Sequence, residues 1–349
     1  MRKKQRKSFA SIQIKKNCQI KKFNFCYLKK INKSSSNTLI AKKILNLFSP
    51  YLNKIYEGTG EWNWLQQNKQ KKFIEVILKK NSFSLSLYLT NMFRNEATYG
   101  YLSPSFSDCT RNKKQVSSDI LNNIDTCLEF TDLLKISNLT NNVGNPYGLK
   151  LSTGFVLPDT PRHYYYAHNI FNLIKEKINP YIVEIGGGYG GSCLQLWKRF
   201  KGKVTIINID LLSGIIVTYF FLKKNGVPVN IVYKKSEVKE NMVNLIVFEN
   251  QMSLKKIIPK CHLIFNSRSL CEMSKDSIKF YFDYINNSKC KFFYHENSNY
   301  LMFPNSKRHL EIMSDDFPIN KKIFSLQTKY ITPFTGGDGR YREYVYKSI

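Results

Sequence analysis

The chain lacks the cysteine spacing of a zinc-binding or disulfide-stapled protein. Its eight cysteines include no C-x-x-C pair and no regular framework. Structural zinc sites and small secreted scaffolds both depend on such spacing. The spacing of Asp159, His163, His168 and Glu176 does not suggest a metal site either. We therefore expect reduced thiols, a cytoplasmic location and no bound metal ion.

Long apolar runs are also missing. The longest run, LLSGIIVTYFFL, extends from Leu211 to Leu222 and contains Ser213, Gly214 and Thr218. It is too short and too polar to span a bilayer, so it predicts a buried helix. The N-terminus is positively charged, but the apolar segment of a secretory signal does not follow it. We therefore expect no transmembrane segment and no secretory signal.

Acidic residues are few. The 54 Lys and Arg exceed the 25 Asp and Glu, which gives a net charge of +29. A charge of this size favours nucleic acid or an anionic surface as a partner. Most of the basic residues are Lys, however, and Arg, which suits bidentate phosphate recognition, is scarce. A solvated lysine-rich surface is the favoured interpretation, and an acidic glycan, a lipid headgroup or nucleic acid is the alternative.

Glycines cluster where a predicted strand ends. Residues 181–191 read YIVEIGGGYGG, and a second apolar strand at 204–209 ends at Asp210. This is the layout of a nucleotide-cofactor site at the edge of a parallel sheet. Glycine allows the backbone to approach a bulky ligand, because it has no Cβ. Asp210 is expected to accept hydrogen bonds from both hydroxyls of a ribose.

Two cofactors fit this motif. Gly186, Gly188 and Gly191 match the dinucleotide pattern G-x-G-x-x-G. Glu184 with Gly186, Gly188 and Gly190 matches E-x-G-x-G-x-G, which resembles motif I of S-adenosylmethionine-dependent methyltransferases. The acid within the strand would serve the ammonium group of that cofactor, and the motif follows a long N-terminal region. Both features favour S-adenosylmethionine, and a nicotinamide or flavin cofactor, or a glycine turn without a cofactor, is the alternative.

Apolar spacing divides the chain into three parts. We expect a basic, partly disordered arm at 1–37, a helical region at 38–140 and an α/β domain at 141–349. In the last part we expect helices at 163–177, 212–225, 253–258 and 274–286 and an amphipathic stretch at 192–200. We expect strands at 181–185, 204–209, 227–233, 261–266, 291–295, 323–330 and 342–346, and the apolar piece at 243–248 is left unassigned. Such alternation predicts a mainly parallel sheet covered on both faces, with an antiparallel last strand.

The segments that follow the predicted strands carry a further resemblance. IVEIGGGYGG, followed by SRSLCEM and by a strand ending near HEN, resembles the sugar O-methyltransferases of bacterial surface-polysaccharide clusters. Ser269, Glu272 and Met273 match the serine-rich turn leading to Glu-Met in that family. NPYG at 145–148 and RHYYY at 162–166 look like its lead-in to motif I. The resemblance covers residues 140–300, approximately.

This resemblance implies a Rossmann-like methyltransferase sheet, S-adenosylmethionine as cofactor and a sugar or glycan acceptor. Tyr189 would pack on the cofactor, because aromatic faces attract a sulfonium as they attract other cations. The residues expected to bind the cofactor are Glu184, Gly186, Gly188, Tyr189, Gly190 and Asp210.

Methyl transfer to a sugar requires a base, because the pKa of a sugar hydroxyl lies far above neutrality. The candidates are His295 and Glu272, both expected at strand ends, and His295 has the better intrinsic pKa. Arg268 would bind a carboxylated or phosphorylated sugar. The structural alternatives are a hydrogen-bonded loop histidine, a helix-capping glutamate and a surface ion pair.

Other functions stay open at this point. An RNA-directed methyltransferase or RNA-binding protein is favoured by the charge of +29. However, neither an N-P-P-[YFW] motif nor a catalytic cysteine motif follows the strand at 261–266. An NAD-dependent oxidoreductase and a non-catalytic scaffold are the remaining alternatives.

Overall fold

The computed structural model describes residues 25–26, 35–102, 106, 113–133, 135–233, 237–247, 254, 258, 261–301, 310–334 and 339–349. Almost all of the expected basic arm, most of the expected helix at 253–258 and Phe248 lie outside these residues. Within them, no helix has the length and apolar character needed to cross a membrane.

The core of the fold is an eight-stranded sheet with the order β10-β11-β9-β8-β4-β5-β7-β6. Its strands are β4 (Tyr181–Ile185), β5 (Thr205–Asp210), β6 (Val229–Ile231), β7 (Val243–Val247), β8 (Leu263–Ser267), β9 (Phe292–Ser298), β10 (Phe324–Ile331) and β11 (Tyr341–Ser348). Strands β4 to β9 pair in parallel, whereas β11 is antiparallel to both β9 and β10. The predicted Rossmann-like sheet, mainly parallel with an antiparallel last strand, is confirmed.

Helices follow the strands as the apolar spacing predicts. They are α8 (Thr160–Ile174), α9 (Gly191–Arg199), α10 (Leu212–Lys224) and α12 (Lys275–Asn287). Ser274 caps α12, because its side chain accepts a hydrogen bond from the backbone N–H of Ser277. The apolar run at 211–222 is this buried helix α10.

The two faces of the sheet bury alternate residues of each strand. Ile182 and Ile206 pack in one hydrophobic cluster with α8, α9 and α10. Their neighbours Val183 and Ile207 pack in a second cluster with α12. This explains why the strands read as continuous apolar runs rather than as an alternating pattern.

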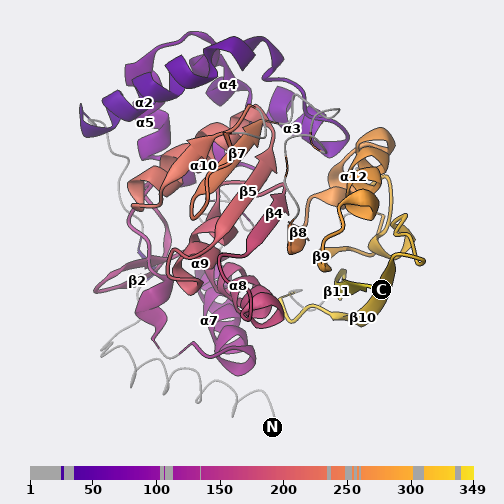
Figure 1. The fold of residues 1–349 in the computed structure, drawn as a ribbon. Coiled ribbons are helices and arrows are strands. Elements are labelled where there is room, and N and C mark those ends of the chain that lie inside the picture. Colours follow the sequence, from indigo (N-terminus) through magenta and orange to yellow (C-terminus); the bar gives the residue numbers. More distant parts are fainter. Residues whose placement is uncertain are drawn as a thin grey trace.

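The N-terminal region packs on the same core. Its helices are α2 (Ser35–Phe48), α3 (Glu61–Asn68), α4 (Lys71–Leu78), α5 (Ser82–Thr90) and α7 (Lys113–Phe130). A small sheet joins β1 (Phe25–Cys26), β2 (Gly148–Leu151) and β3 (Gly154–Val156). Figure 1 shows α2, α4 and α5 gathered beside α10. The rings of Phe48 and Phe93 meet those of Tyr219 and Phe221, so the region shares the main hydrophobic cluster. The division of the chain at 37/38 and 140/141 stays a prediction.

A buried carboxylate links α8 to the C-terminal strands. Glu343 on β11 accepts hydrogen bonds from the hydroxyls of Tyr294 (2.6 Å), Tyr330 (2.6 Å) and Tyr165 (3.0 Å), and from the amide of Asn169 (3.2 Å). Burial raises the pKa of Glu343, and these four donors oppose that effect. The cluster satisfies a carboxylate that is fully removed from solvent.

We predict that Glu343→Ala lowers the free energy of unfolding by about 3 kcal/mol, because buried tyrosine hydroxyls lose their acceptor. Glu343→Gln, which keeps one acceptor oxygen, is expected to lose less. Urea unfolding measures both. Asp283→Ala on exposed α12 surface is the control and should change stability by less than about 0.5 kcal/mol. Equal stability of wild type and Glu343→Ala would show that the cluster does not hold these elements together.

Candidate functional site

The site lies in the crevice between the carboxyl ends of β4 and β8. Strand β4 pairs with β5 on one side and with β8 on the other, and β8 pairs with β9 on its far side. The chain runs from β4 to β5 and from β8 to β9, so the loops after β4 and β8 leave in opposite directions. Open α/β sheets bind ligands at such a switch point. The two loops are in contact, because a Cβ on Gly186 would overlap the hydroxyl of Ser269.

The glycine loop after β4 adopts a backbone that other residues rarely adopt. Gly186 and Gly188 have φ values of +71° and +58°. The backbone N–H of Gly186 donates to the carbonyl of Ile209 at 2.8 Å. A Cβ on Gly188 would lie 3.3 Å from the ring of Tyr101. Glycine is therefore required here both by conformation and by close approach.

Asp210 fixes the glycine loop from the end of β5. Its carboxylate accepts hydrogen bonds from the backbone N–H groups of Gly188 and Leu211, both at 2.7 Å. Burial raises the pKa of Asp210 to about 7, although both hydrogen bonds favour the charged form. The predicted acid thus lies beside the predicted glycines.

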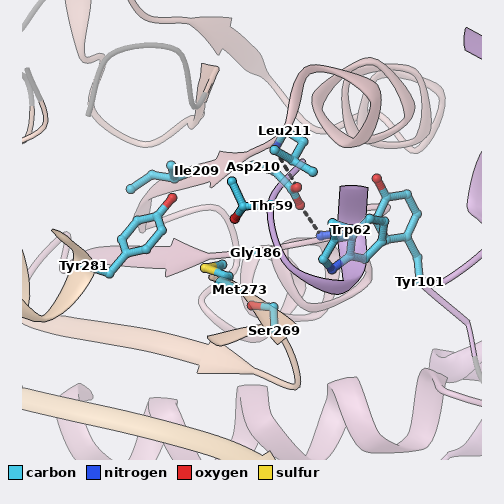
Figure 2. Close-up of a pocket in the computed structure, with 11 residues that line it drawn as sticks. Thr59, Trp62, Tyr101, Gly186, Ile209, Asp210, Leu211, Ser269, Met273 and Tyr281 are labelled. Carbon is cyan, nitrogen blue, oxygen red and sulfur yellow. Dashed lines mark hydrogen bonds between the residues drawn. The ribbon is translucent and has the colours of Figure 1, made fainter. Parts of the chain in front are cut away.

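An apolar slot opens next to Asp210. Figure 2 shows Trp62 and Tyr101 on one side of it, and Ile209 and Tyr281 on the other. The slot is lined by Thr59, Trp62, Tyr101, Gly186, Gly188, Ile209, Asp210, Leu211, Ser269, Met273 and Tyr281. Such a narrow space with aromatic and aliphatic walls suits a flat heteroaromatic ring.

A larger polar chamber continues from the slot. Trp62, Tyr101, Gly186, Gly188 and Ser269 line both, so slot and chamber meet over the glycine loop. The ionisable residues that line the chamber are Glu61, Tyr99, Tyr101, Asp159, Arg162, His163, Glu184, Tyr189, Arg268, Glu272 and Tyr341. One elongated site therefore has an apolar end and a charged end.

Residues from the N-terminal region cover the glycine loop, which we did not foresee from the sequence. The rings of Trp62 and Tyr101 stack with centroids 4.8 Å apart. The indole N–H of Trp62 donates to the carboxylate of Glu272 at 3.0 Å. The hydroxyls of Thr59 and Ser277 lie 3.0 Å apart. The signal available in the sequence was the tryptophan pair at 62 and 64, which we assigned only to a helix.

Glu184 lies at the base of the chamber, within β4. Its carboxylate accepts hydrogen bonds from the thiol of Cys193 at 2.9 Å and from the amide of Asn208 at 3.3 Å. Burial raises its pKa. A ligand cation in the chamber would offset that burial, which suits the expected role toward an ammonium group.

Glu272 and Arg268, two of the predicted catalytic residues, both line the chamber. Burial raises the pKa of Glu272 to about 8, and the Trp62 hydrogen bond and the charge of Arg268 oppose the shift. Arg268 donates to the carboxylate of Glu296 at 2.8 Å and stacks on the ring of Tyr341 at 4.0 Å. Glu272 therefore has a pKa suited to accepting a proton near neutral pH.

The structure does not bring His295, the third predicted catalytic residue, to the site. We expected a strand that ends at His295, but β9 continues to Ser298. His295 is therefore an interior strand residue, and its ring packs against Tyr344 (4.5 Å), Phe293 (4.9 Å) and Phe317 (5.1 Å). Burial lowers its pKa to about 3. The next residue, Glu296, faces the opposite side and contacts both Arg162 and Arg268.

Two residues of the glycine motif serve packing. Gly190 begins α9 with φ +87°, and a Cβ there would lie 2.9 Å from Thr218 of α10. It lines neither slot nor chamber. Tyr189 borders the chamber, but its ring packs edge-on against Phe93 and Phe221. No group of three or more metal-ligating side chains occurs among the described residues, and the expectation of no metal stays a prediction.

No protein-family model matches the chain, and no curated protein matches its sequence. Solved structures resemble part of it. The mitomycin 7-O-methyltransferase MmcR is 10% identical with a TM-score of 0.37, over 54% of this chain and 55% of that one. TrmN from Thermus thermophilus is 10% identical with a TM-score of 0.39, over 58% and 56%. An S-adenosylmethionine-dependent methyltransferase from Clostridium acetobutylicum is 10% identical with a TM-score of 0.38, over 53% and 91%.

The match spans little more than half the length of MmcR and of TrmN. Likeness at this level does not carry a cofactor or an acceptor from those proteins to this chain. Both have to be inferred from the residues that line the crevice.

We predict that Gly186→Ala destabilises the protein more than Gly226→Ala does. Both glycines have similar positive φ values, +71° and +76°, but a Cβ on Gly226 would meet no atom within 4 Å. Gly226→Ala should therefore cost only the backbone strain, about 1 kcal/mol. Gly186→Ala must also displace Ser269 and should cost about 1–3 kcal/mol more. Equal losses in urea unfolding would contradict the contact between the two loops.

Proposed function

We propose that the chain is an S-adenosylmethionine-dependent O-methyltransferase that methylates a sugar hydroxyl in surface-polysaccharide or glycan biosynthesis. The observation that carries the proposal is the elongated crevice at the switch point, with Asp210 beside an apolar slot and carboxylates in a polar chamber. Its two ends match the two ends of S-adenosylmethionine. The sugar acceptor is supported by the resemblance at Ser269, Glu272 and Met273.

The residues of the crevice fit this cofactor. The slot of Ile209, Leu211 and Tyr281 has the apolar walls that an adenine ring requires. Asp210 would accept hydrogen bonds from the ribose hydroxyls, and Glu184 would receive the ammonium group. The glycines between them leave room over the loop, because a side chain there would occupy the space.

The cofactor supplies an electrophilic methyl group on a positively charged sulfur. The chain's own residues must align the acceptor oxygen with that methyl group and remove the hydroxyl proton. We propose that the Glu272 carboxylate takes this proton as the carbon–oxygen bond forms and the carbon–sulfur bond breaks, its electron pair going to sulfur. Trp62 orients the carboxylate through its indole N–H.

Arg268 is proposed to assist Glu272 rather than to transfer a proton. Its positive charge opposes the burial effect and keeps the pKa of Glu272 from rising further. His295 is not proposed as the base, because aromatic rings enclose it and it does not line the chamber. We propose a cytoplasmic location, in keeping with eight cysteines that lack C-x-x-C spacing.

An RNA-directed activity is the second candidate. The charge of +29 favours it. It predicts an affinity for RNA that falls steeply with salt concentration. Filter binding to a mixed-sequence RNA at two salt concentrations distinguishes it from the sugar proposal.

We predict that S-adenosylmethionine and S-adenosylhomocysteine bind in isothermal titration and that NAD does not. Asp210→Asn should weaken binding about ten- to hundredfold, because the ribose loses a charged acceptor. Gly188→Arg should abolish binding, because the side chain would fill the space beside Tyr101. Asp283→Asn removes a carboxylate from the exposed surface and is the matched control. Binding of NAD alone would replace the proposal with an oxidoreductase.

We predict that Glu272 titrates near pH 8. Its folded-state pKa is raised, so the side chain is protonated below that value and becomes the proton-accepting carboxylate above it. Because Trp62 donates to Glu272, the emission of Trp62 should change with a midpoint near pH 8 in a variant with Trp64 and Trp197 replaced by Phe. Methyl transfer should rise through the same pH range.

Glu272→Gln is the control for this titration, because an amide cannot ionise. The emission change with a midpoint near pH 8 should be absent from this variant, and its methyl transfer should be lost at every pH. A midpoint near pH 4.5, the ordinary value, would argue against Glu272 as the base.

A further inference from the structure

Two arginines from different elements meet at the charged end of the chamber. Arg162 comes from the first turn of α8, and Arg268 directly follows β8. Both line the chamber, and the pKa of Arg268 is lowered by burial and, to a smaller extent, by the charge of Arg162. Two buried positive charges are costly unless negative charge nearby compensates them. Glu296, fully buried on β9, supplies part of that charge.

Glu296 neutralises Arg268 better than it neutralises Arg162. Its Oε1 accepts from both Nε (3.1 Å) and Nη2 (2.8 Å) of Arg268. Its Oε2 lies 3.9 Å from Arg162 and has no hydrogen-bond partner among the described residues. The contact of Arg162 with Asp159, at 3.3 Å, is also longer than a charge-assisted hydrogen bond.

The hydrogen-bonding capacity of Arg162, which lines the chamber, is thus not fully used by its protein partners. Its side chain is buried, and its Nε has no hydrogen-bond partner in the described part of the chain. Its remaining hydrogen bonds are long ones to the hydroxyls of Ser267 (3.2 Å) and Tyr166 (3.3 Å). A buried polar atom without a partner costs stability unless a ligand satisfies it.

Arg268 is held in an unusual conformation that directs it to the same place. Its φ is +56°, which is rare for a residue with a Cβ. The backbone N–H of Arg268 donates to the carbonyl of Glu296 at 2.7 Å, and its guanidinium stacks on Tyr341. Strain of this kind persists where the surroundings fix it, and it is concentrated at ligand sites.

Guanidinium groups bind carboxylates and phosphates through paired hydrogen bonds. We propose that Arg162 and Arg268 form a subsite for an oxyanion on the acceptor, which is therefore an acidic sugar bearing a carboxylate or a phosphate. The proposal rests on the proposed function, because the same chamber contains Glu272, the proposed base. The ring of Tyr341 beside Arg268 gives the sugar an aromatic surface to pack on.

The test measures sugar binding to the full chain saturated with S-adenosylhomocysteine. The probes are glucuronic acid, glucose 1-phosphate and glucose. Their binding is measured by ligand-observed NMR titration. We expect at least one acidic sugar to bind about tenfold or more tightly than glucose. The acid that shows the preference identifies the carboxylate or the phosphate. Arg162→Met should remove that preference and leave S-adenosylhomocysteine affinity unchanged. Arg268→Met should also reduce the preference.

Two further variants separate recognition from folding. Arg162→Lys keeps the charge but loses the planar fork, so it should retain the fold and lose most of the preference. Arg199→Met breaks the 2.7 Å pair with Asp132 outside the chamber and should retain the full preference.

The outcomes distinguish the two proposals. Equal binding of acidic and neutral sugars, with S-adenosylhomocysteine bound, would overturn the anion subsite and leave the methyltransferase proposal intact. Failure of S-adenosylhomocysteine to bind would overturn the methyltransferase proposal. The preference of that same protein for acidic over neutral sugars would still be measured. Its dependence on Arg162 would then show whether the anion subsite exists.

Discussion

The close contact between the loops after β4 and β8 determines the rest of the site. Gly186 has no Cβ, so the hydroxyl of Ser269 can lie against its backbone. Below them, Asn266 donates to the carbonyl of Ile185 at 2.8 Å and accepts from Asn297 at 2.7 Å. Three neighbouring strand ends are thereby held at fixed spacing. Gly186 and Ser269 line both the slot and the chamber.

Burial gives the charged groups of the crevice their chemical character. Asp210 and Glu272 are carboxyl groups whose pKa values rise to about 7 and 8. Arg268 shows the converse effect, because burial lowers its pKa to about 10. In each case the charged form is left short of solvation, so a ligand of opposite charge or with matching donors would gain from entering. This is a common property of functional sites rather than of a stable core.

The sequence was sufficient to predict the sheet, because hydrophobic runs of strand length alternate with helical patterns from residue 160 onward. It also located the glycine loop, Asp210, Arg268 and Glu272, since these directly follow predicted strands. It failed at His295, because a strand end misplaced by three residues turned an interior residue into an apparent loop residue. Arg162, Trp62 and Tyr101 were missed because they reach the site through tertiary packing, which local patterns do not encode.

The hydrogen bond between Trp62 and Glu272 joins the N-terminal region that covers the glycine loop to an ionisable group. An indole N–H binds a carboxylate more strongly than it binds a carboxylic acid. Contact of Trp62 with the site and loss of the Glu272 proton therefore favour each other. By thermodynamic linkage, ionisation of Glu272 strengthens this contact by the same free energy by which the contact favours ionisation. On the proposed role of Glu272 as the base, the contact between Trp62 and Glu272 would be strongest while Glu272 is ready to accept a proton. It would weaken once that proton has been received.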